Sequence, residues 1–253
     1  PLQAGAELYG FDGIAADIEI IGLMLDSLAL ADFGDVLLSL GHIGVFRALA
    51  ASAELSPQQS ETLLAMMQDK NVAAVRGQVE AWALDGMWRK AFSLLPTLYG
   101  GREILAQARE KLPDLSLIGK ALDELEAVCQ AFPQRAVHID LAELRVDNYH
   151  TGLLYAAYGS DGHDAVARGG RYDGLGGYFG RSRPATGFSF DLRKFLGRLP
   201  QGGRRTAIAV ALADTADAAE EIARLRAEGE TVVVDYGMEA NSTRDGSRRL
   251  LKQ

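Results

Sequence analysis

Hydrophobic and polar positions repeat with different periods along this chain, and the changes of period divide it into segments. Near the start, five apolar residues recur at spacings of four and three, which predicts a core-facing amphipathic helix. A short apolar run at 36–40 predicts a buried strand that leads into a helix around 45–51. The apolar residues of the first helix are Ile14, Ile18, Ile21, Leu25 and Leu28.

In residues 52–131, apolar residues at helical spacing are interrupted by polar residues, and few side chains are β-branched. Ser56 is followed by Pro57, and Gln59 stands three residues after Ser56, which is typical of a capped helix start. Glycine and proline then divide the stretch into several short helices. We interpret this stretch as a helical insertion. The residues that break it are Gly77, Gly86, Pro96, Gly100 and Pro113.

Strand patterns return at 136–141, 152–158 and 165–168. The last two are separated by Gly159-Ser-Asp-Gly162, which predicts a hairpin. Because residues 153–157 are apolar on both phases of the alternation, we expect the hairpin to be covered on both faces.

A small second domain is predicted after the linker Pro200-Gln-Gly-Gly203. A strand at 207–212, a helix capped by Asp214 or Thr215 that stops at Gly229, and a strand at 231–235 form a strand–helix–strand unit. The expected fold class is therefore α+β: an antiparallel sheet flanked by helices in a core domain at 1–199, with a small α/β domain at 204–253.

Composition narrows the possible functions. The chain has 253 residues, 48% hydrophobic content and a net charge of −8, so nucleic-acid binding would need a local basic patch, and none stands out. The lone Cys129 excludes an intramolecular disulfide and fits a reducing cytoplasm. We expect no metal, no cofactor and no membrane span. Because Pro1 begins an informative segment without Met, we also expect residues upstream of it.

Three segments carry unusual chemistry, and each also has a simpler interpretation. Gln3 and Glu7 would share one face of a strand and could hold an ammonium or imidazole N–H, although such pairs are also common on surfaces. Residues 144–152 hold a cation and two aromatic side chains that could equally cap the core. Gly169-Gly-Arg-Tyr-Asp-Gly174 lets a ligand approach the backbone beside recognition groups. We expect a small-molecule pocket at residues 168–177 without a complete catalytic set.

The order of these segments resembles the histidyl-tRNA synthetase family of class II synthetases. It is completed by Pro184-Ala-Thr-Gly-Phe-Ser-Phe-Asp-Leu-Arg193, and the resemblance covers most of residues 1–196, including the helical insertion. What the resemblance implies is a class II synthetase-like sheet and a histidine-binding pocket. By position, histidine-binding roles fall on Gln3, Glu7, Arg145, Tyr149, His150, Gly169, Gly170, Arg171 and Tyr172.

The last segment departs from the synthetase pattern. Asp191 stands where the family has a glycine that lets adenine approach, which adds bulk and negative charge beside a polyanion. Lys194 stands where the family has an arginine that contacts the ATP phosphates, and it lacks the bidentate fork; Arg193 is out of register. About 50 residues follow the linker, where a synthetase has a full anticodon-binding domain. We therefore expect the ATP site to be disabled and tRNA binding to be absent.

These departures resemble a paralogous family, the regulatory subunits of ATP phosphoribosyltransferase. That resemblance implies a non-catalytic partner of the short-form catalytic subunit in the first step of histidine biosynthesis, with a homodimeric core in a hetero-octamer and L-histidine as effector. Histidine could bind the synthetase-like pocket or a subunit interface. Two alternatives stay open: an active histidyl-tRNA synthetase, and a freestanding sensor that binds histidine or RNA.

Overall fold

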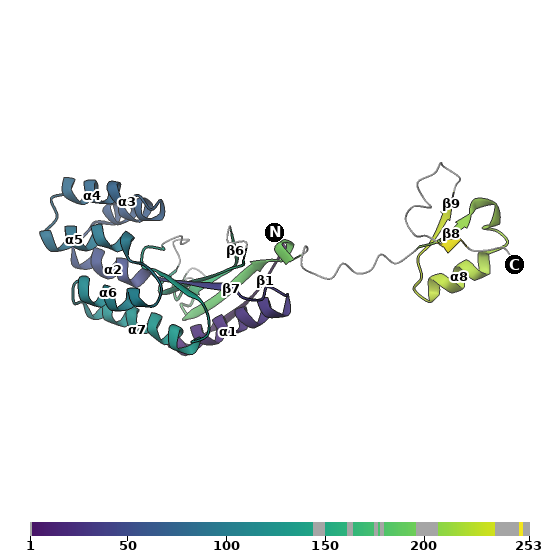
Figure 1. The fold of residues 1–253 in the computed structure, drawn as a ribbon, viewed down its shortest axis with the longest axis horizontal. Coiled ribbons are helices and arrows are strands. Elements are labelled where there is room, and N and C mark those ends of the chain that lie inside the picture. The colour runs from purple at the N-terminus through teal and green to yellow at the C-terminus, as the bar shows by residue number, and fades with distance from the viewer. Residues whose placement is uncertain are drawn as a thin grey trace. The chain divides into compact units, whose positions relative to one another are not determined.

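The computed structural model describes residues 2–143, 150–160, 164–174, 177, 180–195, 207–235 and 248–249 (Figure 1). The chain divides into two compact units, Pro1–Arg198 and Leu199–Gln253. Each unit has its own sheet and its own hydrophobic core.

The first unit is built on a seven-stranded sheet with the strand order β1-β7-β6-β5-β2-β4-β3. Neighbouring strands are antiparallel except β2 and β4, which run parallel. The sequence predicted an antiparallel sheet and did not predict β3, a two-residue strand at its edge. The strands are β1 (Gln3–Tyr9), β2 (Leu37–His42), β3 (Tyr99–Gly100), β4 (Val137–Asp140), β5 (Leu153–Tyr158), β6 (Ala165–Arg171) and β7 (Ala185–Asp191).

Helices cover one face of this sheet, and in Figure 1 α1 and α7 lie on the same side of it. The predicted first helix is present as α1, and its buried residues include Ile21, Leu25 and Leu28. The helices of the first unit are α1 (Ile14–Leu30), α2 (Ile43–Ser52), α3 (Pro57–Gln68), α4 (Val72–Ala81), α5 (Gly86–Leu94), α6 (Glu103–Lys111) and α7 (Ser116–Ala131).

Local chemistry explains where two of these helices begin. Ser56 caps α3: its Oγ accepts from the Gln59 backbone N–H at 3.2 Å, and the Gln59 side chain accepts from the Ser56 N–H at 2.9 Å. This confirms the predicted capping box. Helix α2 begins at the end of β2, where His42 Nδ1 accepts from the Gly44 N–H and His42 Nε2 contacts Glu124 of α7 at 2.8 Å.

The register of the sheet separates its two faces. Directly opposed residues in neighbouring antiparallel strands share a face, and so do residues two apart in one strand. Arg171 contacts Asp17 of α1, so the face that carries Arg171 is the helix-covered face. We call the other face, which carries Glu7, Gly170 and Gly187, the open face.

The second unit is a three-stranded parallel sheet with one helix. Strands β8 (Ile208–Ala211) and β9 (Val232–Asp235) flank α8 (Ala219–Ala227), and β10 (Arg248–Arg249) pairs with β8. The helix starts later than the predicted cap at 214–215, because the Thr215 hydroxyl donates to the Leu212 carbonyl at 2.7 Å instead of capping α8. The predicted stop is present: Gly229 follows the helix with φ +85°.

Candidate functional site

The open face of β1 presents the predicted amide and carboxylate together. Solvent exposure alternates along β1, with the odd-numbered residues more exposed, so Gln3 and Glu7 do share a face. Each faces a residue of β7: Gln3 is opposite Asp191 and Glu7 is opposite Gly187. At ~3.4 Å per residue the two α-carbons are about 14 Å apart, so the two side chains lie at opposite ends of the surface between them.

Two glycines form the floor beside Glu7. Gly187 is opposite Gly170 in the sheet, so Glu7, Gly187 and Gly170 make one row across three strands. The Glu7 side chain occupies the space above Gly187 that a Cβ atom would need. The His150 ring occupies the equivalent space above Gly170, where a Cβ would lie 2.6 Å from Cδ2. Both glycines are therefore required for these side chains to lie on the sheet.

His150 and Tyr172 form the aromatic side of the site. Their rings meet edge to face, with centroids 6.4 Å apart and planes at 88°. The His150 carbonyl accepts from the Arg47 guanidinium at 2.7 Å, and the Tyr172 N–H donates to the Ala185 carbonyl at 2.8 Å. The polar and aromatic groups predicted from separate segments thus meet on one surface.

Burial alters the acidity of Glu7. The residue as a whole is exposed, but its carboxylate lies against the backbone of β7, and this partial burial raises the pKa of Glu7 above its usual value. A donor placed on the carboxylate would relieve the cost of that desolvation. Glu7 is therefore suited to accept a hydrogen bond from a cationic or strongly polarised N–H group.

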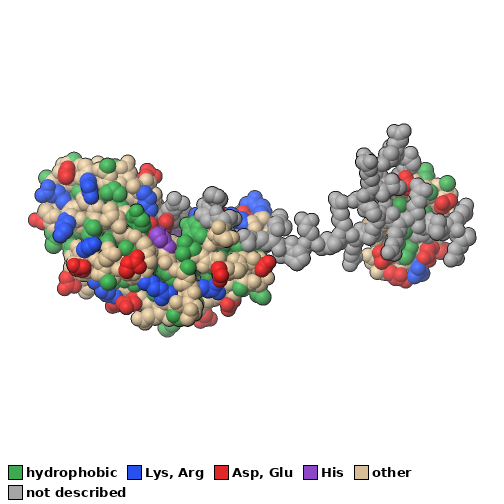
Figure 2. Space-filling view, viewed as in Figure 1, with side chains coloured by type: hydrophobic (Ala, Val, Ile, Leu, Met, Phe, Trp, Pro, Cys, Tyr) green, Lys and Arg blue, Asp and Glu red, His purple; other side chains and the backbone are tan. Residues whose placement is uncertain are grey.

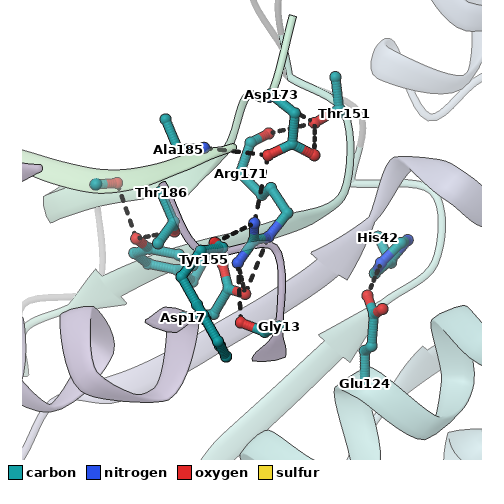
Figure 3. Close-up of polar contacts among 12 residues, drawn as sticks. Gly13, Asp17, His42, Glu124, Thr151, Tyr155, Arg171, Asp173, Ala185 and Thr186 are labelled. Carbon is teal, nitrogen blue, oxygen red and sulfur yellow. Dashed lines mark hydrogen bonds and ion pairs between the residues drawn. The ribbon is translucent and has the colours of Figure 1, made fainter. Parts of the chain in front are cut away.

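Arg171 does not belong to this surface, which corrects its predicted role. It follows Gly170 in the strand and so points to the helix-covered face (Figure 3). There its Nε donates to Asp17 Oδ2 at 3.0 Å, and its Nη2 reaches the Gly13 carbonyl at 3.1 Å. The prediction failed because paired glycines give no signal of which neighbour faces which side.

On the helix-covered face, below the two glycines, a buried network links β5 to β7 across β6. The Tyr155 hydroxyl donates to the Gly187 carbonyl at 2.8 Å and lies 3.3 Å from the Thr186 hydroxyl (Figure 3). Burial raises the pKa of Tyr155, so the group stays neutral. Gly169 is needed here for a different reason from that predicted, because a Cβ atom would overlap the Tyr155 ring on the covered face.

The Asp173 carboxylate links the segment that contains His150 to the start of β7. Its Oδ1 accepts from the Ala185 N–H at 3.1 Å, and its Oδ2 accepts from the Thr151 hydroxyl at 3.1 Å. Thr151 follows His150, and Asp173 follows Tyr172, so the carboxylate fixes both aromatic residues of the site in position.

The two residues predicted to mark a disabled ATP site lie at the end of β7. Asp191 is held by Arg193, whose Nε donates to Oδ1 at 3.0 Å and whose Nη2 donates to Oδ2 at 2.5 Å. This pairing with Arg193 lowers the pKa of Asp191 to about 2. Lys194 turns to β6, where its Nζ donates to the Ala165 carbonyl at 2.9 Å.

Some predicted features cannot be placed. Arg145 and Tyr149, and residues 175–176 of the predicted pocket segment, lie outside the described residues. Among the side chains that are described, no three His, Cys, Asp or Glu are grouped as metal ligands would be. None of the described helices is long and apolar enough to cross a membrane.

Comparison with known proteins identifies the family to which this chain belongs. The sequence profile of histidyl-tRNA synthetases matches residues 1–195. The chain belongs to the histidyl-tRNA synthetase family. Glu7, His150 and Tyr172, to which the resemblance assigned histidine-binding roles, lie together on the open face, and the class II synthetase-like fold is confirmed.

Relatives within this family refine the comparison. The ATP phosphoribosyltransferase regulatory subunit of Neisseria gonorrhoeae is 65% identical over 252 residues, which is all of this chain and 66% of the relative. An ATP phosphoribosyltransferase regulatory subunit/histidyl-tRNA synthetase from Bacillus halodurans has a similar structure, with a TM-score of 0.79 and 27% identity over 98% of this chain and 67% of that one. The resemblance to the regulatory subunits is confirmed.

A third comparison supports the fold alone. A chain of the ATP phosphoribosyltransferase complex from Thermotoga maritima matches with a TM-score of 0.58 and 22% identity, over 74% of this chain and 65% of that chain. The present chain spans less than two thirds of the length of the Neisseria relative.

Asp17 was missed in the sequence, whereas Arg168 belonged to the predicted pocket segment 168–177 but was not assigned to a face of the sheet. Asp17 lies among the apolar residues of α1, at the helical spacing that faces the sheet, and this position alone could have indicated a buried partner. Arg168 stands two residues before Gly170, so alternation places it on the open face. The strand was predicted to end at Arg168, and this hid that relationship.

Proposed function

We propose that this chain acts as a regulatory subunit of ATP phosphoribosyltransferase and binds L-histidine on the open face of its sheet. The observation that carries the proposal is the row formed by Glu7, Gly187 and Gly170, closed by His150 and Tyr172, in a chain 65% identical to a protein named as such a subunit. The reaction served is the first step of histidine biosynthesis, in the cytoplasm.

Histidine suits the chemistry of this surface. Its ammonium and imidazole N–H groups are donors, and Glu7 and the Gln3 amide oxygen are acceptors at opposite ends of the surface between them. The Glu7 carboxylate lies over Gly187 and the His150 ring lies over Gly170, so the glycine row brings an acceptor and an aromatic ring close to the backbone. Tyr172 meets the His150 ring and completes an aromatic wall.

The partner in this proposal is the short-form catalytic subunit, which condenses ATP with phosphoribosyl pyrophosphate. A homodimeric core of regulatory subunits would organise a hetero-octamer. L-Histidine then inhibits only to the extent that it binds the inhibited assembly more tightly than the active one, because a ligand shifts an equilibrium by its differential affinity.

Loss of synthetase activity belongs to the same proposal. Arg193 compensates the charge of Asp191, so the expected repulsion of ATP is smaller than the sequence suggested. The bulk of Asp191 and the engagement of Arg193 and Lys194 elsewhere still argue against an ATP site at the end of β7. Basic and acidic side chains are interspersed on the face shown in Figure 2, which does not favour tRNA.

Two experiments separate this proposal from its alternatives. Co-purification of the chain with a short-form catalytic subunit is expected, and failure to co-purify at micromolar concentrations would favour a freestanding sensor. Histidine-dependent exchange of pyrophosphate into ATP by this chain alone is expected to be absent. Measurable exchange would favour an active histidyl-tRNA synthetase.

A further inference from the structure

Arg168 is a cation on the open face that the proposed histidine site has not used. It lies on β6 two residues before Gly170 and directly opposite Ser189 of β7, and its side chain is exposed. Its guanidinium donates no hydrogen bond and forms no ion pair within the described part of the chain. The two residues that follow in the same row across the sheet are small: Ser189 of β7 lies opposite Arg168, and Gly5 of β1 lies opposite Ser189.

Two acids on the open face, Asp191 and Glu7, leave the Arg168 guanidinium available. On β7 the diagonal neighbour Asp191 is already bound by Arg193 through both carboxylate oxygens. Glu7 is two strands away and one row along. With about 4.8 Å between strands and about 6.6 Å per two residues, the α-carbons of Glu7 and Arg168 are roughly 12 Å apart.

This spacing leaves a gap between a carboxylate and a guanidinium. The Glu7 carboxylate lies over Gly187, and the small residues Gly5 and Ser189 stand in the row between β1 and Arg168, so the space between the two charged groups suits a molecule with a cationic and an anionic end. A free amino acid has that charge pattern. Arg presents a planar fork of N–H donors that matches a carboxylate in two hydrogen bonds.

We propose that Arg168 binds the free α-carboxylate of the amino acid on the open face, which rests on the proposed function. In an activated amino acid the carboxylate has become part of a mixed anhydride with phosphate and no longer carries its own charge. Arg168 therefore selects the free amino acid, which a feedback sensor must recognise, over its activated form. Asp191 and Arg193 act as positioning residues, because their mutual ion pair keeps Asp191 from neutralising Arg168.

The test compares two ligands and three variants by calorimetry. L-Histidine carries the carboxylate, and L-histidinol has a hydroxymethyl group in its place. Arg168→Gln removes the charge, Arg168→Lys keeps it without the fork, and Arg183→Gln changes an exposed arginine of the 181–184 segment as a control. Thermal melting of each variant checks folding.

Wild type and Arg183→Gln are expected to prefer L-histidine over L-histidinol. Arg168→Gln should lower the affinity for L-histidine roughly tenfold to a hundredfold and leave that for L-histidinol unchanged, because a charge-assisted contact is lost for one ligand only. Arg168→Lys should retain part of the preference.

Three results would overturn the assignment, and they are distinguishable. If wild type binds L-histidine and Arg168→Gln keeps the full preference, Arg168 has no carboxylate role while the proposed function stands. Inorganic phosphate and ATP are titrated in the same way, and if Arg168→Gln weakens only their binding, the guanidinium belongs to a phosphate site. If wild type binds neither amino-acid ligand, the histidine site itself fails together with this inference.

Discussion

The Arg171 guanidinium and the Asp17 carboxylate form a buried ion pair that joins the sheet to helix α1. Their side chains are 7% and 2% exposed, and the Nη2–Oδ2 distance is 2.5 Å. Arg171 also donates to the carbonyls of Phe11 and Gly13, just before the helix. The pair therefore fixes β6 against α1. Gly170, the residue before Arg171 in β6, lies on the open face beneath His150.

Replacing Asp17 should destabilise the first unit strongly. Asp17→Ala removes the buried partner of Arg171 and leaves only the more exposed Asp173, 3.3 Å from Nη1, and loss of a buried ion-pair partner typically costs about 3–5 kcal/mol in the free energy of unfolding. Asp26→Ala, at an exposed position of the same helix, should change it by less than about 0.5 kcal/mol. Urea unfolding followed by tryptophan fluorescence measures this, because Trp82 and Trp88 both lie in the first unit. Equal effects of the two substitutions would contradict the importance of the pair.

Replacing Gly187 with alanine should weaken histidine binding, because the Glu7 carboxylate occupies the space that the new methyl group would need. In Gly187→Ala the new Cβ would overlap the Glu7 carboxylate and come within 2.7 Å of the Ala6 carbonyl. We expect the affinity for L-histidine to fall at least about tenfold as Glu7 is displaced. Gly77→Ala in α4 is the control, because nothing lies within 4 Å of its Cβ position and alanine favours helix. Unchanged histidine binding in Gly187→Ala would show that Glu7 does not contact the ligand.

The carboxyl group of Glu7 should titrate above the usual range for glutamate. Partial burial against β7 raises its pKa in the free protein, and a bound cationic donor should lower it again. Because the ionised form accepts the donor, affinity for histidine should fall as the pH drops through this raised pKa. Carbon-13 NMR titration with and without L-histidine measures both values, and Glu7→Gln assigns the signal. If the pKa of Glu7 lies in the usual range and does not change when L-histidine is added, Glu7 does not contact the ligand.

Much of the fold follows from local patterns in the sequence. The α1 stripe and the Ser56 capping box were predictable because the apolar spacing and the cap are local interactions. The start of α8 was not, since Thr215 can donate backward to Leu212 or cap forward, and the sequence does not distinguish them. The short strand β3 depends on β4, which lies far along the chain.

The sequence predicted which residues form the candidate site better than it predicted the face of the sheet to which each side chain points. Gln3 and Glu7 share a face because four residues of strand return to the same side. The misplacement of Arg171 came from register, which only the pairing of β6 with β5 and β7 defines. The Asp191–Arg193 pair was missed because Arg193 lies in a helical turn beyond the end of β7, where strand alternation no longer says which side chains meet.

The rate of a short-form ATP phosphoribosyltransferase, measured with and without this chain and then with increasing L-histidine, tests the central claim most directly. We expect a low rate for the catalytic subunit alone, a higher rate when this chain is added, and inhibition of the combined activity by L-histidine. A rate that is the same with and without the chain, and equally insensitive to L-histidine in both mixtures, would contradict the account.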